Sequence, residues 1–198
     1  MNIRNTLPFM LAAGTLISDQ AVSQTIANLY IKSGLTAQRF LNSLDLPKDI
    51  NPSNADTLFA SQRYPDQYSQ IKIVSESLDT VIDSFVNLAE GAGASPIEAK
   101  TAVEKGVVDA LKKKKLDLSK ESDLNLIKKE ITEEISKLEN VDLKVFKNLS
   151  SDTVKAIKNV NEQFSNIEDI YSSEAKNTFS TSNQLSNQIR KAVDAEKL

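Results

Sequence analysis

The side chains able to do chemistry in this chain of 198 residues are carboxylates, lysines, hydroxyls and amides, because histidine, cysteine and tryptophan are absent. Without histidine or cysteine the chain cannot form a Ser-His or Cys-His nucleophile pair, a zinc site with nitrogen or sulfur ligands, or a disulfide. The adjacent carboxylates Glu133-Glu134 and Glu168-Asp169 point to different sides of a helix, so neither pair forms a catalytic couple. We therefore expect a non-enzymatic protein with no cofactor and no bound metal.

One segment has the oxygen spacing of the opening of a calcium loop. Asp49, Asn51 and Ser53 carry oxygen at alternate positions, as calcium loops do. The twelfth position, however, is Ala60, where such a loop needs a bidentate glutamate, and the sixth is Asn54, where it needs glycine. The segment is therefore predicted to be a turn and capping cluster.

The basic patch of the sequence is a lysine quartet, which consists of Lys112, Lys113, Lys114 and Lys115. It falls in the last turn of a predicted helix, where cations oppose the negative end of the helix dipole. Nucleic-acid binding would need arginines, stacking aromatics or a groove-reading helix, and the net charge of −3 is too small to steer nucleic acid. We expect a solvated helix end and no nucleic-acid partner, with contact to phosphate or anionic lipid as the weaker alternative.

The composition favours long helices. The chain is 40% hydrophobic and 26% charged, which is ordinary for a globular protein. It has five glycines and five prolines, where average usage would give roughly fourteen and ten. We expect an all-α protein in which amphipathic helices form a bundle, with a long central helix and a polar C-terminal helical tail.

The long central helix is predicted from Asp66 to Glu90, with Gly91 as its end. Its apolar residues recur at alternating steps of three and four, which is an a/d seam. The seam consists of Ile71, Val74, Leu78, Val81, Phe85 and Leu88. Ile82 and Val86 widen it to the broad stripe of a bundle helix. We expect this seam to bind helices of other subunits.

The helices that follow are predicted from their caps and spacing. Ser95-Pro96-Ile97-Glu98 forms a capping box with proline in the first turn. Later helices are expected to begin at Ser119 or Ser122, and at the cluster of residues 150–152. Val141, Leu143 and Val145 alternate as in a short strand, but the apolar spacing that follows favours helix.

Past Tyr171 the apolar residues are sparse, so the last segment is predicted either to fray or to lie along a partner. The organisation we expect comprises an apolar N-terminal helix at 1–34, short helices and the central helix at 35–94, a helical bundle at 95–171 and a polar tail at 172–198.

The N-terminal segment has an apolar run from Leu7 to Ile17 behind Arg4, with small residues before Gln24. This layout is typical of a secretory signal cleaved after Ser23. Helical periodicity that continues to residue 33 favours instead a retained helix. The run is too short to span a bilayer.

Three functions remain open from the sequence. The first is a non-enzymatic structural protein that assembles through helix–helix contacts in a multi-subunit particle, such as a virion or a secretion machine. The second is an exported helical binding module, in a periplasm or outside the cell. The third is a membrane-active protein that inserts Leu7, Phe9 and Met10 at a bilayer interface, with the lysine quartet on anionic lipid. The sequence leaves the localisation open among these.

Overall fold

The ordered elements of the computed structural model are helices throughout the residues that it describes, which are 25–54, 61 and 64–196. In chain order they are a helix over residues 25–33, α2 (Ala37–Ser43), a 3-10 turn η2 (Pro52–Asn54), α4 (Pro65–Gly91), α5 (Pro96–Lys113), α6 (Glu121–Ile135), α7 (Leu143–Ser165) and α8 (Ser173–Glu196). The expected all-α bundle with a long central helix is confirmed.

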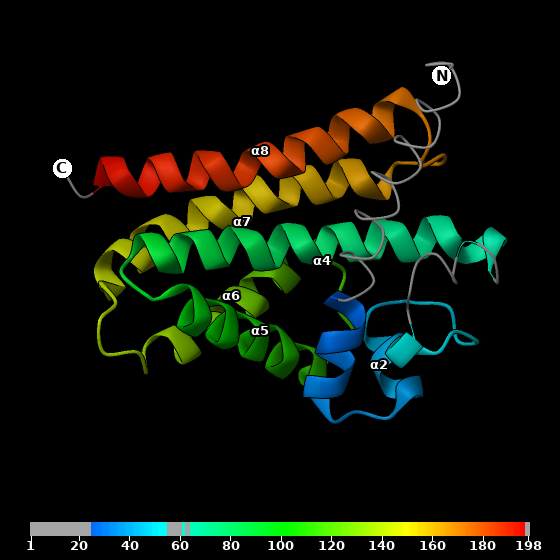
Figure 1. The fold of residues 1–198 in the computed structure, drawn as a ribbon, viewed down its shortest axis with the longest axis horizontal. Coiled ribbons are helices and arrows are strands. Elements are labelled where there is room, and N and C mark those ends of the chain that lie inside the picture. The colour runs from blue at the N-terminus through cyan, green and yellow to red at the C-terminus, as the bar shows by residue number, and fades with distance from the viewer. Residues whose placement is uncertain (1–24, 55–60, 62–63, 197–198) are drawn as a thin grey trace, which may run out of the picture.

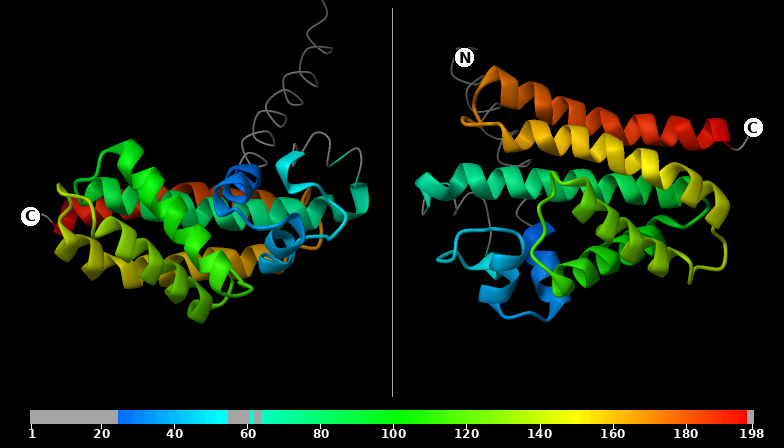
Figure 2. Two further views of the ribbon diagram at one scale, coloured as in Figure 1. Left: turned by 90° about the horizontal axis from the view of Figure 1, so that it is seen from below. Right: turned by 180° about the vertical axis from the view of Figure 1, so that it is seen from behind.

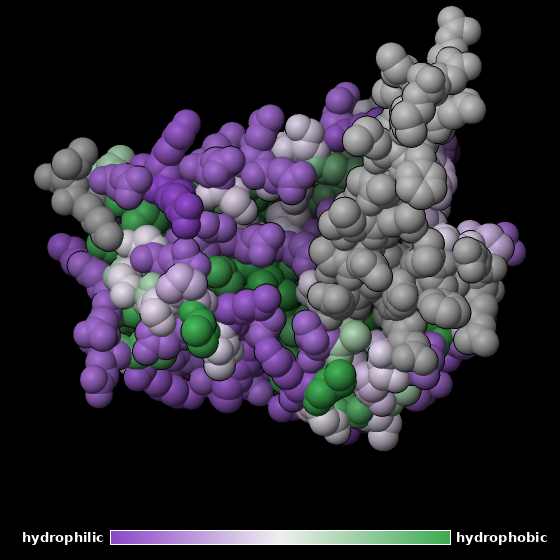
Figure 3. Space-filling view, in the orientation of Figure 1, coloured by the Kyte–Doolittle hydropathy of each residue, from purple (hydrophilic) through white to green (hydrophobic). Residues whose placement is uncertain are grey.

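Helix α4 is the central element of the bundle. It packs against α5, α7 and α8, while α6 packs against α5 and α7. Figure 1 shows α7 and α8 stacked on one side of α4, and the α5–α6 hairpin on the other. The same order is seen from behind in Figure 2. In the space-filling view, polar side chains cover most of one face and apolar side chains gather near its centre (Figure 3).

The apolar seam of α4 lies inside this bundle. Leu78, Val81, Phe85 and Leu88 are fully buried, Ile71 is 1% exposed, and Val74 packs partly buried against the same core. The Phe85 ring lies 6.3 Å from that of Phe146 on α7, centroid to centroid. The sequence interpretation of the seam as a free docking surface for other subunits is therefore wrong for this conformation, because the chain's own helices cover it.

The polar tail is a packed helix of the bundle. Helix α8 buries Leu185, Ile189 and Val193 against α4 and α7. Its approach to α4 is close, because a Cβ placed on Gly91 would lie 2.6 Å from Cγ1 of Val193. The expectation that this segment frays or needs a partner is wrong, since α4 and α7 hold it.

Polar contacts add to the attachment of α8. The hydroxyl oxygens of Thr80 and Ser182 lie 2.6 Å apart. Arg190 of α8 donates to Glu90 of α4 at 3.1 Å. Such hydroxyl pairs and ion pairs leave no trace in an apolar pattern, which explains why the periodicity understated how well this helix packs.

Helix ends follow local capping chemistry. Ser95 Oγ accepts from the Glu98 N–H at 3.4 Å, and Glu98 Oε2 accepts from the Ser95 N–H at 3.2 Å, which confirms the predicted capping box. Helix α4 ends at Gly91 as predicted. Helix α7 begins at Leu143 with Asp142 as its cap. The helix start predicted at residues 150–152 is therefore wrong, and the strand alternative before it is excluded.

Candidate functional site

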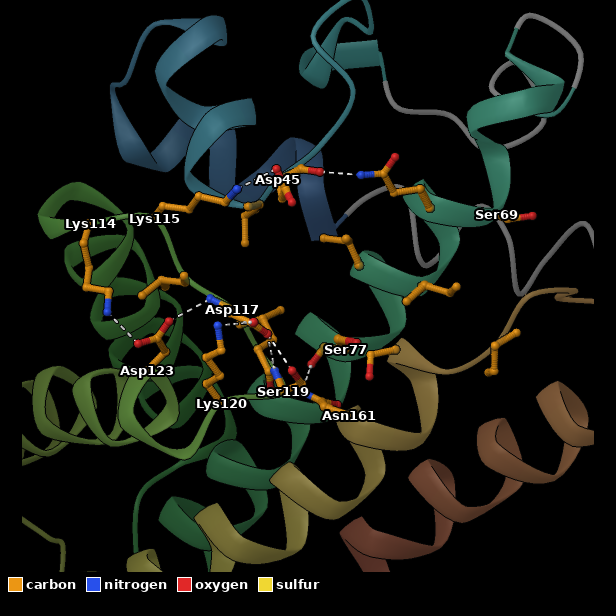
Figure 4. A pocket seen from close by; sticks show the side chains of 18 of the residues that line it. Asp45, Ser69, Ser77, Lys114, Lys115, Asp117, Ser119, Lys120, Asp123 and Asn161 are labelled. Atoms are coloured by element: carbon orange, nitrogen blue, oxygen red, sulfur yellow. Dashed lines mark hydrogen bonds and ion pairs between the residues drawn. The ribbon is translucent and has the colours of Figure 1, made fainter.

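A groove of about 990 Å³ is the candidate functional site (Figure 4). It lies between the first half of α4, the turn after α2, the loop that joins α5 to α6, and the C-terminal part of α7. Its size is at the upper end of the range of ligand pockets, about 300–1,000 Å³. A concave surface with converging polar groups is the default place to look for binding.

The α5–α6 loop, residues 114–120, is held in a defined conformation. Asp117 Oδ1 accepts from the N–H of Ser119 at 3.1 Å and from its hydroxyl at 2.6 Å, a local turn typical of aspartate. Asp123 Oδ2 accepts from the N–H of Asp117 at 2.8 Å. The N–H of Leu116 donates to the Ser43 carbonyl oxygen at 2.8 Å, which ties the loop to the end of α2. The site is thus built on a loop that the bundle positions.

Two carboxylates of this loop region are kept ionised. Burial disfavours the charged form of both, but the hydrogen bonds outweigh it. Those from Ser119 and Lys120 hold the pKa of Asp117 below its ordinary value, and those from Lys114 and the Asp117 N–H lower the pKa of Asp123. The ion-pair distances are 3.1 Å for Lys120–Asp117 and 2.6 Å for Lys114–Asp123.

Asn161 of α7 is the most deeply buried polar residue of the groove lining, which also includes the buried Ser77 and Asp123. It is 1% exposed, and its Nδ2 donates to the Leu118 carbonyl oxygen at 2.9 Å and to the Ser77 carbonyl oxygen at 3.4 Å. Because both neighbours are acceptors, the amide cannot be turned over without placing its oxygen against them. Its Oδ1 has no hydrogen-bond partner within the described part of the chain. A buried acceptor without a partner costs about 1–3 kcal/mol.

The lysine quartet lies at the end of α5 and continues into the groove. Lys112 pairs with Asp109 at 3.5 Å and Lys113 with Glu130 at 2.5 Å. Lys114 and Lys115 line the groove, and Lys115 pairs with Asp45 at 2.7 Å. All four side chains are exposed. Lys112 and Lys113 fall in the last turn of α5 as expected, whereas the placement of Lys114 and Lys115 in that turn is wrong, because the helix ends at Lys113. Each of the four cations has a carboxylate partner.

The other predicted features are placed as follows. Leu7, Phe9 and Met10 lie outside the described residues. Asn51 Oδ1 accepts from the Ser53 N–H at 3.1 Å and from its hydroxyl at 2.7 Å, which confirms the predicted turn. In the described ranges, no group of three or more acidic side chains is arranged to hold a metal ion. No helix within those ranges combines the length and apolarity needed to cross a bilayer.

A further carboxyl group with a shifted pKa lies outside the groove. Asp79 of α4 accepts a hydrogen bond from the Thr25 hydroxyl at 2.6 Å. Burial raises the pKa of Asp79 from 3.8 to about 7. This contact joins the helix over residues 25–33 to α4, and Ile26 and Leu29 of the same helix are buried in the core.

Sequence reasoning missed the groove, although the sequence contains one signal of it. Asn161 falls four residues after Ile157 and three before Phe164, in the middle of an apolar helical stripe. A polar side chain at such a buried position either has its hydrogen-bond partners within the fold or calls for a functional explanation. No comparable signal marks the bonding of Asp123 to the Asp117 N–H and to Lys114, since it depends on how α5 and α6 meet.

Comparison of the chain with protein-family models, with curated proteins and with solved structures finds no match. The function must therefore be argued from the groove and the surfaces of this bundle.

Proposed function

We propose that this chain is a non-enzymatic binding module whose ligand site is the groove between α4, the α5–α6 loop and α7. The observation that carries the proposal is the groove itself, a concavity of about 990 Å³ in which charged side chains of the α5–α6 loop region converge beside the first half of α4. Concave surfaces with a few converging polar groups are the usual place of ligand binding.

The electrostatics of the groove favour binding over catalysis. A general acid or base works best with a pKa near the working pH. The pKa values of Asp117 and Asp123 are shifted the other way, below their ordinary values. The chain also has no histidine or cysteine to act in their place. These groups can orient a ligand but are poorly tuned to move protons.

The binding proposal is tested with a chemically mixed library of small molecules, scored by ligand-observed NMR and thermal shift. Ser69 lines the groove, so Ser69→Trp should obstruct it. Ser180→Trp places the same bulk on an exposed position of α8 and is the matched control. The proposal predicts ligands that bind the wild type and the control but not Ser69→Trp. A library with no such ligand would contradict it.

Assembly into a multi-subunit particle is the second candidate function, and a different surface supports it. A shallow apolar pocket of about 180 Å³ lies between α7 and α8 and is lined in part by Leu149, Ala156, Leu185 and Ile189. Apolar pockets between surface helices suit a helix of another subunit. The α4 seam no longer supports this function, because it is covered within the chain.

Light scattering after size-exclusion chromatography over a concentration series tests the assembly proposal. An oligomer that Ala156→Glu disrupts would support it, provided that Ala195→Glu, at an exposed position, leaves the oligomer intact. A monomer at every concentration would contradict it.

The membrane and export alternatives depend on residues outside the described ranges and remain predictions. Mass spectrometry of protein from a secreting host tests export through loss of residues 1–23. Liposome flotation with and without residues 1–20 tests membrane binding.

A further inference from the structure

We infer that the contact between Thr25 and Asp79 is a pH-dependent latch, which holds the helix over residues 25–33 on α4 in acidic solution and loosens it as the pH rises to neutral. The latch lies outside the groove, so it operates whether or not the groove binds a ligand. Three features support it: the short helix that is held, the hydrogen bond that holds it, and the charges around that bond.

The helix over residues 25–33 depends on packing for its stability. It has nine residues and ends before Gly34, whose positive φ of 63° belongs to a turn. Isolated helices shorter than about 12 residues are marginal in water, so contacts with the bundle must hold this one. Ile26 and Leu29 supply apolar contacts, because both are buried in the core. Figure 1 shows the helix in dark blue, beneath α4 in that view.

A polar contact lies at each end of this helix. At its first residue, the Thr25 hydroxyl donates to Asp79 Oδ1 of α4 at 2.6 Å. In its last turn, Lys32 pairs with Glu104 of α5. Burial is the main reason why the pKa of Asp79 is raised to about 7. The carboxyl group at the first contact is therefore neutral in acidic solution and becomes a partly buried anion near neutral pH.

The other carboxyl groups of α4 oppose the ionisation of Asp79. Glu76 lies one turn before it and Asp83 one turn after it, and their negative charges raise its pKa further. Lys72 acts in the opposite direction, but its ammonium group also pairs with Glu76 at 3.1 Å. Water therefore stabilises the ionised form of Asp79 better than this interface does.

The elements packed against this part of α4 are α5, α7 and α8. Burial raises the pKa of Asp83, and the positive charge of Lys100 on α5 opposes this rise. From α7 and α8, the residues hydrogen-bonded to this stretch of α4 are the uncharged Asn161 and Ser182. The titration of the latch is therefore assigned to Asp79, with Asp83 as the neighbouring group that a test must separate from it.

The direction of the pH effect follows from proton binding. Opening of the short helix exposes Asp79 to water and returns its pKa towards the ordinary value of 3.8. The closed form thus binds the proton more tightly than the open form does. Opening becomes easier as the pH rises from about 4 to 7, and it levels off above about 7. Local openings of this kind occur while the remainder of a protein stays folded.

Labelling of single cysteines in the folded protein tests the latch, because the chain has no cysteine of its own. Ser33→Cys reports on the short helix, and Ser150→Cys reports on α7. The two serines are matched, since each is 4% exposed and donates to the carbonyl oxygen of the residue three positions earlier, at 2.7 and 2.9 Å. The rate of reaction with dithiodipyridine is divided, at each pH, by the rate for an unfolded cysteine peptide.

We expect the corrected rate for Ser33→Cys to rise about tenfold between pH 5 and pH 7.5. At pH 7.5 it should exceed the rate for Ser150→Cys, because the short helix opens while the bundle stays folded. Asp79→Asn should abolish the rise, whereas Asp83→Asn, which removes the neighbouring carboxyl group, should keep it. A rate that does not change with pH, a rise that persists in Asp79→Asn, or equal rates for the two cysteines would overturn the latch.

The hydrogen bond is tested at its donor. Thr25→Val removes the hydroxyl and should raise the corrected labelling of Ser33→Cys at pH 5 by about fivefold, while Thr25→Ser keeps a hydroxyl and should restore it. Equal labelling of the valine and serine variants would overturn the role of the bond. Amide hydrogen exchange of residues 26–33 in the unsubstituted chain, corrected for its intrinsic pH dependence, repeats the measurement without a cysteine. Protection that does not fall between pH 5 and pH 7.5 would overturn the latch by this route too.

Discussion

Replacing Asp79 by asparagine should make the protein more stable at neutral pH. The carboxyl group accepts from the Thr25 hydroxyl at 2.6 Å, and an asparagine oxygen can accept the same bond. Burial is the main reason why the pKa of Asp79 is raised to about 7, and the negative charges of Glu76 and Asp83 add to the rise. The Thr25 hydrogen bond and the positive charge of Lys72 act in the opposite direction. The substitution keeps the hydrogen bond and removes the buried charge.

The size of the effect follows from the difference in proton affinity of Asp79 between the two states. The folded chain binds the proton more tightly than the unfolded chain, whose aspartate keeps its ordinary pKa of 3.8. As the pH rises from about 4 to 7, the unfolded chain loses its proton first, so the free energy of unfolding falls, and it levels off above about 7. A difference in the pKa of Asp79 between 3.8 in the unfolded chain and about 7 in the folded chain corresponds to about 4 kcal/mol of the free energy of unfolding. Because Asp79 is partly exposed, solvent screening reduces this, and we expect about 2 kcal/mol.

The assay is urea unfolding followed by circular dichroism at pH 4.5 and pH 8. Asp79→Asn should gain about 2 kcal/mol over the wild type at pH 8 and much less at pH 4.5. Asp152→Asn is the control, since Asp152 is an exposed carboxylate paired with Lys155 at 3.1 Å, and it should change stability little at either pH. An equal gain at both pH values, or a loss at pH 8, would refute the reasoning.

Three further substitutions test the packing and the loop. Gly106→Ala should lower the free energy of unfolding by about 1–3 kcal/mol, because its Cβ would lie 2.6 Å from the backbone Cα and N of Ile131; an unchanged melting temperature would contradict this contact. Leu78→Asp places a charge at a fully buried position and should unfold the chain, so a folded monomer of wild-type stability would contradict the assigned core. Asp123→Asn should cost about 1–3 kcal/mol at pH 7, measured by urea unfolding. That cost should vanish as the pH falls through the lowered pKa of the wild-type carboxyl group.

Much of the helical architecture could be predicted because its causes are local. The capping box at Ser95 and the end of α4 at Gly91 involve residues within a few positions of each other. The spacing of Leu78, Val81, Phe85 and Leu88 identified the buried face of the central helix. The local prediction failed at residues 150–152, because a serine and aspartate cluster is also tolerated within a helix whose cap lies earlier in the chain.

The candidate site could not be predicted in the same way, because its residues are brought together by packing. Lys115 reaches Asp45 across 70 positions of the sequence, and Asn161 reaches the Leu118 carbonyl oxygen across 43. A charge run such as the lysine quartet shows where cations lie, but the partner that neutralises each one is set by the meeting of separate helices.

The sequence by itself determined that this protein is helical, where α4 ends and α5 begins, and which face of the long helix must be covered. These follow from hydrogen bonds and caps that join residues about four positions apart. Only the tertiary structure decided that the chain's own α5, α7 and α8 cover that face, and that Asn161 lines a groove with an unpartnered oxygen. An apolar stripe has the same pattern whether its cover is internal or comes from another subunit, since burial is non-directional.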